Sequence, residues 1–151
     1  MILIDTNALV ILLVGLMDTS LIGKHKRTSI YEEQDFINLV SMIGQLDKLI
    51  VLPNVWTETD NLLNKFPGDQ KYLYITKTIE TMKSTTEKFI ESVKGVEHHS
   101  FYNLGLTDSL LLQYAKECEL LITSDSALSD YALANDIRVY DIVKNRNERL
   151  Q

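Results

Sequence analysis

Four acidic residues that are far apart in the sequence are candidates to bind one cation together: Asp5, Glu58, Asp108 and Asp125. Asp5 interrupts the apolar opening MILIDTN, just before the apolar run ALVILLV resumes. A carboxylate in an apolar setting is costly unless it is hydrogen-bonded or binds a metal. Carboxylates that crowd together also raise one another's pKa unless a cation compensates. Ligand sets made only of oxygen suit Mg²⁺ or Mn²⁺, so these residues predict a divalent-metal site.

Two of the acids come directly after stretches that are typical of strands. The apolar segment Ile2–Ile4 ends at Asp5, and Asp125 lies just past the strand-like Leu120–Thr123. Short apolar strands that alternate with amphipathic helices indicate a parallel sheet covered on both faces. Ligands of such sheets bind beyond the carboxyl ends of the strands, so we expect both acids at that edge. In the final third of the chain we expect helices at about 107–117 and 126–134, and strands at 120–123 and 137–140.

Helical phase places Glu58 on the same side. A helix is expected to begin at Pro53, because proline is tolerated in a first turn. Its buried stripe is best drawn through Val55, Thr59, Leu62 and Phe66. Glu58 lies three residues after Val55 and four before Leu62, so it shares this stripe near the helix start. Asp60 points away, which makes Glu58 the candidate ligand of this helix.

The same reasoning applies to Asp108 in the segment LTDSLLLQYAKEC. The apolar stripe of this helix runs through Leu111, Ala115 and Cys118. Extended backwards, it reaches Asp108 in the first turn, on the inner side. Thr107 is the expected N-cap, with Leu106 and Leu111 placed as a hydrophobic staple.

The remaining segments complete an α/β pattern with one domain over residues 1–151. The length suits a single domain, and no linker or repeat is visible. Besides the elements above, we expect helices at about 8–14, 31–46 and 70–93, a strand at 49–52 and an irregular stretch at 15–30. The inner face of the second of these helices is expected to carry Phe36, Leu39, Val40, Ile43 and Leu46.

The expected helix at 70–93 has apolar residues at near-heptad spacing. They are Tyr72, Ile75, Ile79, Met82, Phe89 and Val93. Lengthwise packing on a neighbouring helix of the same chain is one explanation of this series. A helix seam between two subunits is the alternative, and it predicts a homodimer.

Composition limits the class of protein. Hydrophobic residues make up 45% of the chain and charged residues 24%, as in globular domains. The apolar run after Asn7 has no basic region before it and is too short to span a bilayer, so we expect no membrane association. Cys118 is the single cysteine, which favours the cytoplasm. The net charge of −6 argues against a protein that coats nucleic acid, although not against an enzyme that meets phosphate through a metal.

Other interpretations of the acids stay open. Asp5, Asp108 and Asp125 each lie near an expected helix start, where aspartate serves as a cap.

A haloacid dehalogenase-type phosphatase also has a strand that ends in aspartate, but it needs a second aspartate where this chain has Asn7. A phospho-accepting receiver domain needs paired acids at the first strand. The three histidines lack the spacing of metal ligands.

The order of these motifs resembles the PIN-domain nucleases over residues 1 to about 142. The resemblance rests on LIDTN, a glutamate in the third helix, and above all GLTDSLLLQYAKECELLITSDSALSDYALANDIRVYDI. It implies a three-layer α/β/α sandwich around a mostly parallel sheet, with Mg²⁺ or Mn²⁺ bound by Asp5, Glu58, Asp108 and Asp125. By position, the supporting polar residues would be Asn7, Thr107, Thr123 and Ser124.

The resemblance also implies an activity. PIN domains cut RNA by metal-assisted hydrolysis, and many are toxins of bacterial toxin–antitoxin pairs, with an antitoxin protein as partner. The alternative is a catalytically inactive PIN-like module that binds RNA or protein. The basic residues Lys24, Lys26 and Arg27 are candidates for contact with RNA. Further basic residues near the end of the chain are Lys144, Arg146 and Arg149.

Overall fold

An all-parallel, five-stranded sheet lies at the centre of the chain in its computed structural model, which describes residues 1–151. The strand order is β3-β2-β1-β4-β5. The strands are short and apolar where they are central, as expected for strands that are covered on both faces. Their bounds are β1 (Ile2–Ile4), β2 (Leu49–Val51), β3 (Thr86–Glu87), β4 (Leu120–Thr123) and β5 (Val139–Asp141).

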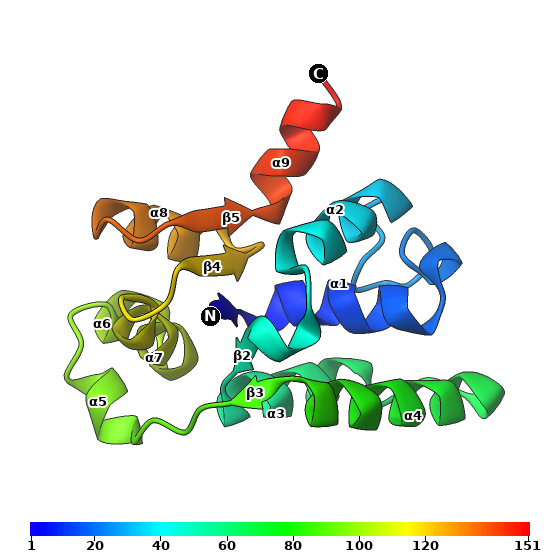
Figure 1. Cartoon of the computed structure of the whole chain (residues 1–151), viewed down its shortest axis with the longest axis horizontal. Coiled ribbons are helices and arrows are strands. Elements are labelled where there is room, and N and C mark those ends of the chain that lie inside the picture. The colour runs from blue at the N-terminus through cyan, green and yellow to red at the C-terminus, as the bar shows by residue number, and fades with distance from the viewer.

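Helices cover both faces of the sheet, so the predicted three-layer α/β/α sandwich is confirmed (Figure 1). One face carries α1 (Thr6–Met17), α2 (Glu33–Ile43), α3 (Pro53–Leu63) and α4 (Gly68–Ser84). The other carries α5 (Ser92–Val96), α6 (Phe101–Leu104), α7 (Leu106–Ala115) and α8 (Ser126–Ala134). Helix α9 (Ile142–Arg149) follows β5 and contacts α2. Two 3₁₀ turns complete the chain, at Thr19–Leu21 and Leu46–Lys48.

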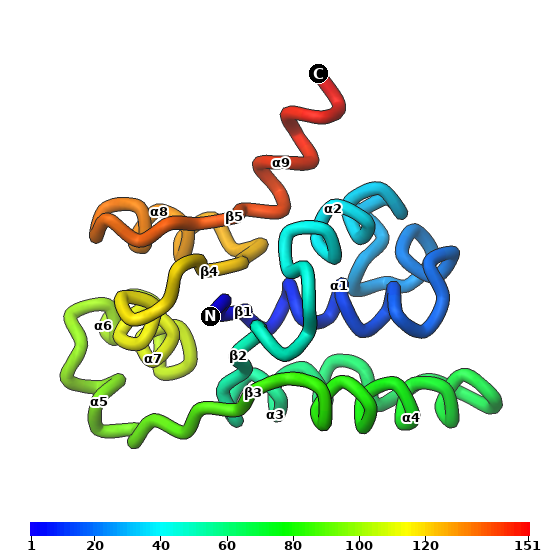
Figure 2. The backbone as a smooth tube through the Cα atoms, viewed as in Figure 1, coloured from blue at the N-terminus to red at the C-terminus, as the bar shows by residue number.

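The strand order creates a crevice between β1 and β4. From β1 the chain proceeds to β2 and β3 through helices on one face, then returns to β4 with helices on the other face (Figure 2). The strands β1 and β4 are neighbours in register, with Ile4 opposite Ile122. Connections that leave in opposite directions open a crevice at the carboxyl ends of such a strand pair. Asp5 lies at this point, where its backbone N–H donates to Ile122 O at 3.0 Å.

The core runs through the whole sandwich around α1. A single cluster of 35 buried apolar residues includes most of α1, which is buried on nearly all sides. Gly15 is the point of closest approach, because a Cβ there would lie 2.1 Å from the Phe36 ring of α2. None of the helices combines the length and the apolar character that a membrane crossing requires.

The prediction of a long helix at 70–93 is wrong at the carboxyl end. Helix α4 stops at Ser84, and the chain continues as the edge strand β3 and the short helix α5. The hydroxyls of Thr81, Ser84 and Thr85 donate to the backbone carbonyls four residues earlier, at 2.7 to 2.9 Å. Side chains that bond the backbone in this way compete with helix continuation, and two β-branched threonines follow Ser84.

The apolar stripe of α4 does not pack on a neighbouring helix. Its residues are exposed by 76% at Tyr72, 44% at Ile75, 47% at Ile79 and 43% at Met82. The buried face of α4 is instead formed by Tyr74, Thr78 and Thr81. Lengthwise packing within the chain, the first explanation of the stripe, is therefore wrong.

Several other boundaries differ from those expected. Helix α1 is longer than 8–14, and a 3₁₀ turn shortens the irregular stretch 15–30. Helix α2 is shorter than 31–46, because Gly44 ends it with a φ of 76°. Val40, expected on its inner face, is exposed. Helix α7 begins at Leu106 with Gly105 as N-cap, so Thr107 is not the cap. Strand β5 lies two residues later than the predicted start, after a turn at Asp136 with a φ of 61°.

Candidate active site

Asp5 is buried at the end of β1, and three donors hold its carboxylate. Oδ1 accepts from the Ala8 N–H at 2.9 Å, which makes Asp5 the N-cap of α1. Oδ2 accepts from the Thr123 hydroxyl and from the Ser124 N–H at 3.3 Å. Burial raises the pKa of Asp5 to about 6, although the three hydrogen bonds oppose this shift. The carboxylate is therefore fixed in position without any basic side chain beside it.

Asp125 lies just beyond β4, and Thr123 connects it to Asp5. Its side chain accepts from the Leu128 N–H at 3.1 Å and caps α8. The Thr123 hydroxyl accepts from the Asp125 N–H at 2.9 Å while it donates to Asp5. One buried hydroxyl thus sets the relative position of the two acids that follow neighbouring strands.

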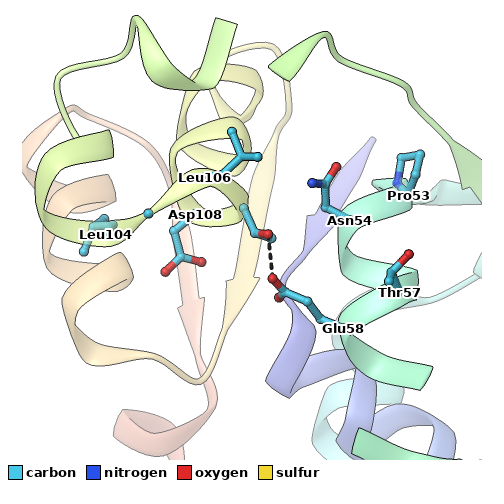
Figure 3. Close-up of a pocket in the computed structure, with 9 residues that line it drawn as sticks. Pro53, Asn54, Thr57, Glu58, Leu104, Leu106 and Asp108 are labelled. Carbon is cyan, nitrogen blue, oxygen red and sulfur yellow. Dashed lines mark hydrogen bonds between the residues drawn. The ribbon is translucent and has the colours of Figure 1, made fainter. Parts of the chain in front are cut away.

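Glu58 connects two distant parts of the chain from its place on α3. Its Oε1 accepts from the Thr6 hydroxyl at 2.7 Å. Its Oε2 accepts from the Thr107 hydroxyl at 2.6 Å, the bond drawn as a dashed line in Figure 3. Thr6 begins α1 and Thr107 lies in the first turn of α7, so the carboxylate spans the crevice. Because Thr107 is not needed as a cap, its hydroxyl is available to orient Glu58.

Asp108 differs from the other three acids, because nothing stabilises its negative charge. It is half-buried in the first turn of α7 and points towards the same space as Glu58 (Figure 3). Burial, and then the charges of Asp125, Asp5 and Glu58, raise its pKa to about 7. No hydrogen bond and no positive charge lowers that pKa. The four carboxylates are therefore close enough to repel one another, with no cation of the protein among them.

These acids line one cavity of about 380 Å³, which we call the acid cavity. Its lining residues are Asp5, Thr6, Asn7, Glu58, Asn61, Leu62, Asp108 and Asp125. A wider cavity of about 680 Å³ adjoins it at Glu58 and Asp108, between α3 and the start of α7 (Figure 3). Together the two cavities form a trough across the carboxyl edge of the sheet.

The structure brings together all four predicted acids and places the supporting residues beside them. Asn7 lines the acid cavity, Thr107 and Thr123 hold carboxylates, and Ser124 contributes its N–H to Asp5. The sequence reasoning missed Thr6 and Asn61. Asn61 had a detectable signal, since it lies one helical turn after Glu58 on the same face.

The basic residues divide into two groups. Lys24 and Lys26 line a separate cavity that shares Leu62 with the acid cavity, while Arg27 does not line it. Near the end of the chain, Arg149 forms ion pairs with Glu32 and Asp35. The Arg146 guanidinium donates to the backbone oxygen of Ile30 at 3.0 Å. These two arginines connect α9 to the first turn of α2 and to the residues just before it, which is a structural role.

The donor set of the acid cavity fits a hard divalent cation. All its polar groups are carboxylates, amides and a hydroxyl, and no histidine or cysteine is present. No three His, Cys, Asp or Glu side chains of the chain enclose an ion position by themselves. Mg²⁺ commonly binds proteins through one or two carboxylates and keeps several waters, so this donor set suits a hydrated ion.

Comparison with known proteins adds no relative. No family model, no curated protein and no solved structure matches the chain.

Proposed function

We propose that the chain is a metal-dependent endoribonuclease that hydrolyses RNA phosphodiester bonds with Mg²⁺ or Mn²⁺. The observation that carries the proposal is that the negative charge of Asp108 has no partner within the chain. Its carboxylate faces three others in an open cavity and has no donor or cation of its own. Such an arrangement costs stability unless a ligand supplies positive charge. The resemblance of the sequence to the PIN-domain nucleases also supports the proposal.

The residues of the acid cavity would divide the work of hydrolysis. A divalent cation, when bound, supplies positive charge to the phosphate and lowers the pKa of an attacking water. Asp5 and Asp125, positioned through Thr123, would hold the cation from the strand side. Glu58 and Asp108 would hold it from the helix side. The amide groups of Asn7 and Asn61 line the same cavity and can donate to phosphate oxygens.

An RNA cleavage assay tests this proposal. The wild-type chain is incubated with a pool of RNA sequences in Mg²⁺ or Mn²⁺, beside Asp108→Asn and Asp130→Asn. Asp130 is an exposed acid of α8 that lines no part of the trough, so it controls for the loss of one charge. We expect wild type and Asp130→Asn to cut RNA, and Asp108→Asn and EDTA-treated wild type to be inactive. Binding of RNA without cleavage by the wild type would instead favour the inactive PIN-like module.

Within this proposal the chain acts in the cytoplasm as the toxin of a toxin–antitoxin pair. The support is the resemblance alone, which also implies an antitoxin protein as partner. If the chain is a toxin, we expect its expression to arrest growth and Asp108→Asn to abolish the arrest. Wild-type expression with normal growth would contradict the toxin role while leaving the nuclease proposal to the cleavage assay.

A second copy of the chain is the partner that fits α4. The exposed residues Tyr72, Ile75, Ile79 and Met82 keep the alternating spacing of three and four that forms a helix–helix seam. Asp69 and Lys83 flank this seam on the same side, one at each end. In an antiparallel, two-fold pair of α4 helices, Asp69 of one copy lies opposite Lys83 of the other. The seam is therefore complementary to itself in charge and in apolar surface, as a two-fold interface requires.

A further inference from the structure

A third cavity, of about 470 Å³, lies next to the acid cavity. The two share Leu62 of α3. The segment after α1 forms one wall and the end of α3 forms the other. We call it the lysine cavity, because Lys24, Lys26 and Lys65 line it and no acidic residue does. In a chain with a net charge of −6, a cavity with this lining is suited to an anion.

The lysines of this cavity have no ionic partners within the chain. The ion pairs of the chain involve the amino terminus, Lys77 and Arg149, all elsewhere. The acid that responds to Lys24 is Asp18, whose pKa is lowered chiefly by hydrogen bonds from Ser20 and only lastly by Lys24. The three ammonium groups are therefore available to an external anion.

The same cavity contains an aromatic surface. The His25 ring lies against the Phe66 ring with a centroid distance of 4.8 Å and an angle of 35° between the planes. Phe66 in turn contacts Tyr74 at 5.7 Å, so the buried rings behind His25 form a firm support. His25 Nδ1 accepts from the Arg27 N–H at 3.1 Å, which orients the imidazole. Burial, together with Lys26 and Arg27, lowers the pKa of His25, which favours the uncharged form of the ring.

We propose that the lysine cavity binds a nucleotide of the RNA substrate that flanks the cut bond, with its base against His25 and its phosphate among Lys24, Lys26 and Lys65. Aromatic rings beside cations are the combination by which proteins hold single-stranded nucleic acid. A base that enters this cavity to stack on His25 is separated from its pairing partner, so the substrate is single-stranded at this nucleotide. This inference rests on the nuclease proposal, which it deepens by naming the form of RNA and the residues that select it.

Binding of RNA is measured in Mg²⁺ with the Asp108→Asn chain, so that cleavage does not consume the probe. The probe is a fluorescein-labelled single-stranded oligouridylate, and the readout is fluorescence anisotropy. We expect His25→Ala to weaken binding by about tenfold, the effect of one lost stacking contact, and His25→Phe to retain it. His99→Ala is the matched control, since His99 is exposed and lines none of the three cavities.

The lysines are tested through the salt dependence of the same binding. Lys65→Ala should lower the slope of log affinity against log salt by about 0.7, the value for one phosphate contact to a single strand. Lys94→Ala, an exposed lysine of α5, should leave that slope unchanged. For a duplex of the same length, His25→Ala should have no effect on affinity.

The two proposals fail separately. In the Asp108→Asn background, equal RNA affinity with and without His25→Ala or Lys65→Ala would overturn the proposed nucleotide site. This holds even when wild type cuts RNA and Asp108→Asn does not. Absence of cleavage in any metal, with binding that depends on His25, would overturn the nuclease and leave the cavity standing. Absence of any RNA binding would overturn both.

Discussion

At the scale of single residues, the acid cavity is an arrangement of negative charge that the protein itself does not neutralise. Three of the carboxylates receive hydrogen bonds from helix starts or hydroxyls, and Asp108 receives none. Asp5 and Asp125 are helix caps, as their positions near expected helix starts predicted, and they also line the cavity. A capping role and a ligand role are compatible in the same side chain, because the capping oxygen accepts one hydrogen bond and a carboxylate oxygen has two lone pairs.

Asp108→Asn should stabilise the metal-free protein at high pH. The pKa of Asp108 is about 7 in the fold, against about 4 in an unfolded chain. Protonation of Asp108 therefore favours the fold. Its contribution to the free energy of unfolding is complete below about pH 4 and is lost as the pH rises from there through about 7. At pH 8 in EDTA, we expect a gain of about 1–2 kcal/mol in the free energy of unfolding, reduced from the full shift because water screens part of the side chain.

Urea unfolding of wild type, Asp108→Asn and Asp130→Asn at pH 5 and pH 8 measures this effect. The free energy of unfolding of Asp108→Asn should exceed that of the wild type by more at pH 8 than at pH 5. An equal difference at both pH values would contradict the account of repulsion among the four acids.

Thr123→Val should disturb the two acids at the strand ends. The change removes the hydroxyl that donates to buried Asp5 and accepts from the Asp125 N–H. Loss of a partner by a buried polar group costs about 1–3 kcal/mol, and Thr123→Ser should recover most of it. Urea unfolding checks the prediction. A valine variant as stable as the serine variant would mean that the hydroxyl has no such role.

At the scale of elements, the sequence predicted best where one local pattern decides the structure. The strand Leu120–Thr123 and the helix Ser126–Ala134 agree with the expected bounds, because an apolar run, an aspartate cap and a turn mark each end. Proline at 53 likewise marked the start of α3. Tertiary contacts decided the rest. Gly105, rather than Thr107, precedes α7, and the hydroxyl of Thr107 goes to Glu58 across the crevice.

Helical phase predicted the site better than it predicted the core. It identified Glu58 and Asp108 as inward-facing from neighbouring apolar residues, and both line the acid cavity. The same reasoning offered packing within the chain as one explanation of the α4 stripe, although that stripe is exposed. Periodicity reveals that a face is apolar, but it does not reveal what covers that face.

Gly15→Ala should weaken the contact between α1 and α2. An added Cβ would lie 2.1 Å from the Phe36 ring, so the ring or a helix must move. Overpacking of this kind costs about 1–3 kcal/mol. Gly23→Ala is the matched control, because the nearest atom to its Cβ would be 3.9 Å away. Thermal unfolding of the two variants gives the comparison, and equal loss of stability would show that the close approach is not limiting.

At the scale of the whole molecule, the trough and the α4 seam lie on different parts of the chain. The trough opens at the carboxyl edge of the sheet, where α3 and α7 face each other, whereas the seam runs along the exposed side of α4. A dimer through the α4 seam therefore uses none of the residues that line the acid cavity.

Ile79→Asp should convert a dimer into a monomer, because it places a charge at the centre of the seam. Ile37→Asp, at an exposed isoleucine of α2, is the matched control and should remain dimeric. Lys83→Asp should weaken the dimer, and the double variant Asp69→Lys with Lys83→Asp should restore it. Light scattering after size-exclusion chromatography reports the mass. A wild-type chain that is monomeric at micromolar concentrations would contradict the dimer.

The central claim is that the four carboxylates form a divalent-cation site, and Mn²⁺ binding tests it most directly. Free Mn²⁺ is measured by electron paramagnetic resonance during titration of wild type, Asp108→Asn and Asp130→Asn at pH 8. We predict that wild type and Asp130→Asn bind Mn²⁺ with the same affinity, and that the affinity of Asp108→Asn is lower by about tenfold or more. Equal Mn²⁺ affinity of wild type and Asp108→Asn, or no binding by wild type, would contradict the claim.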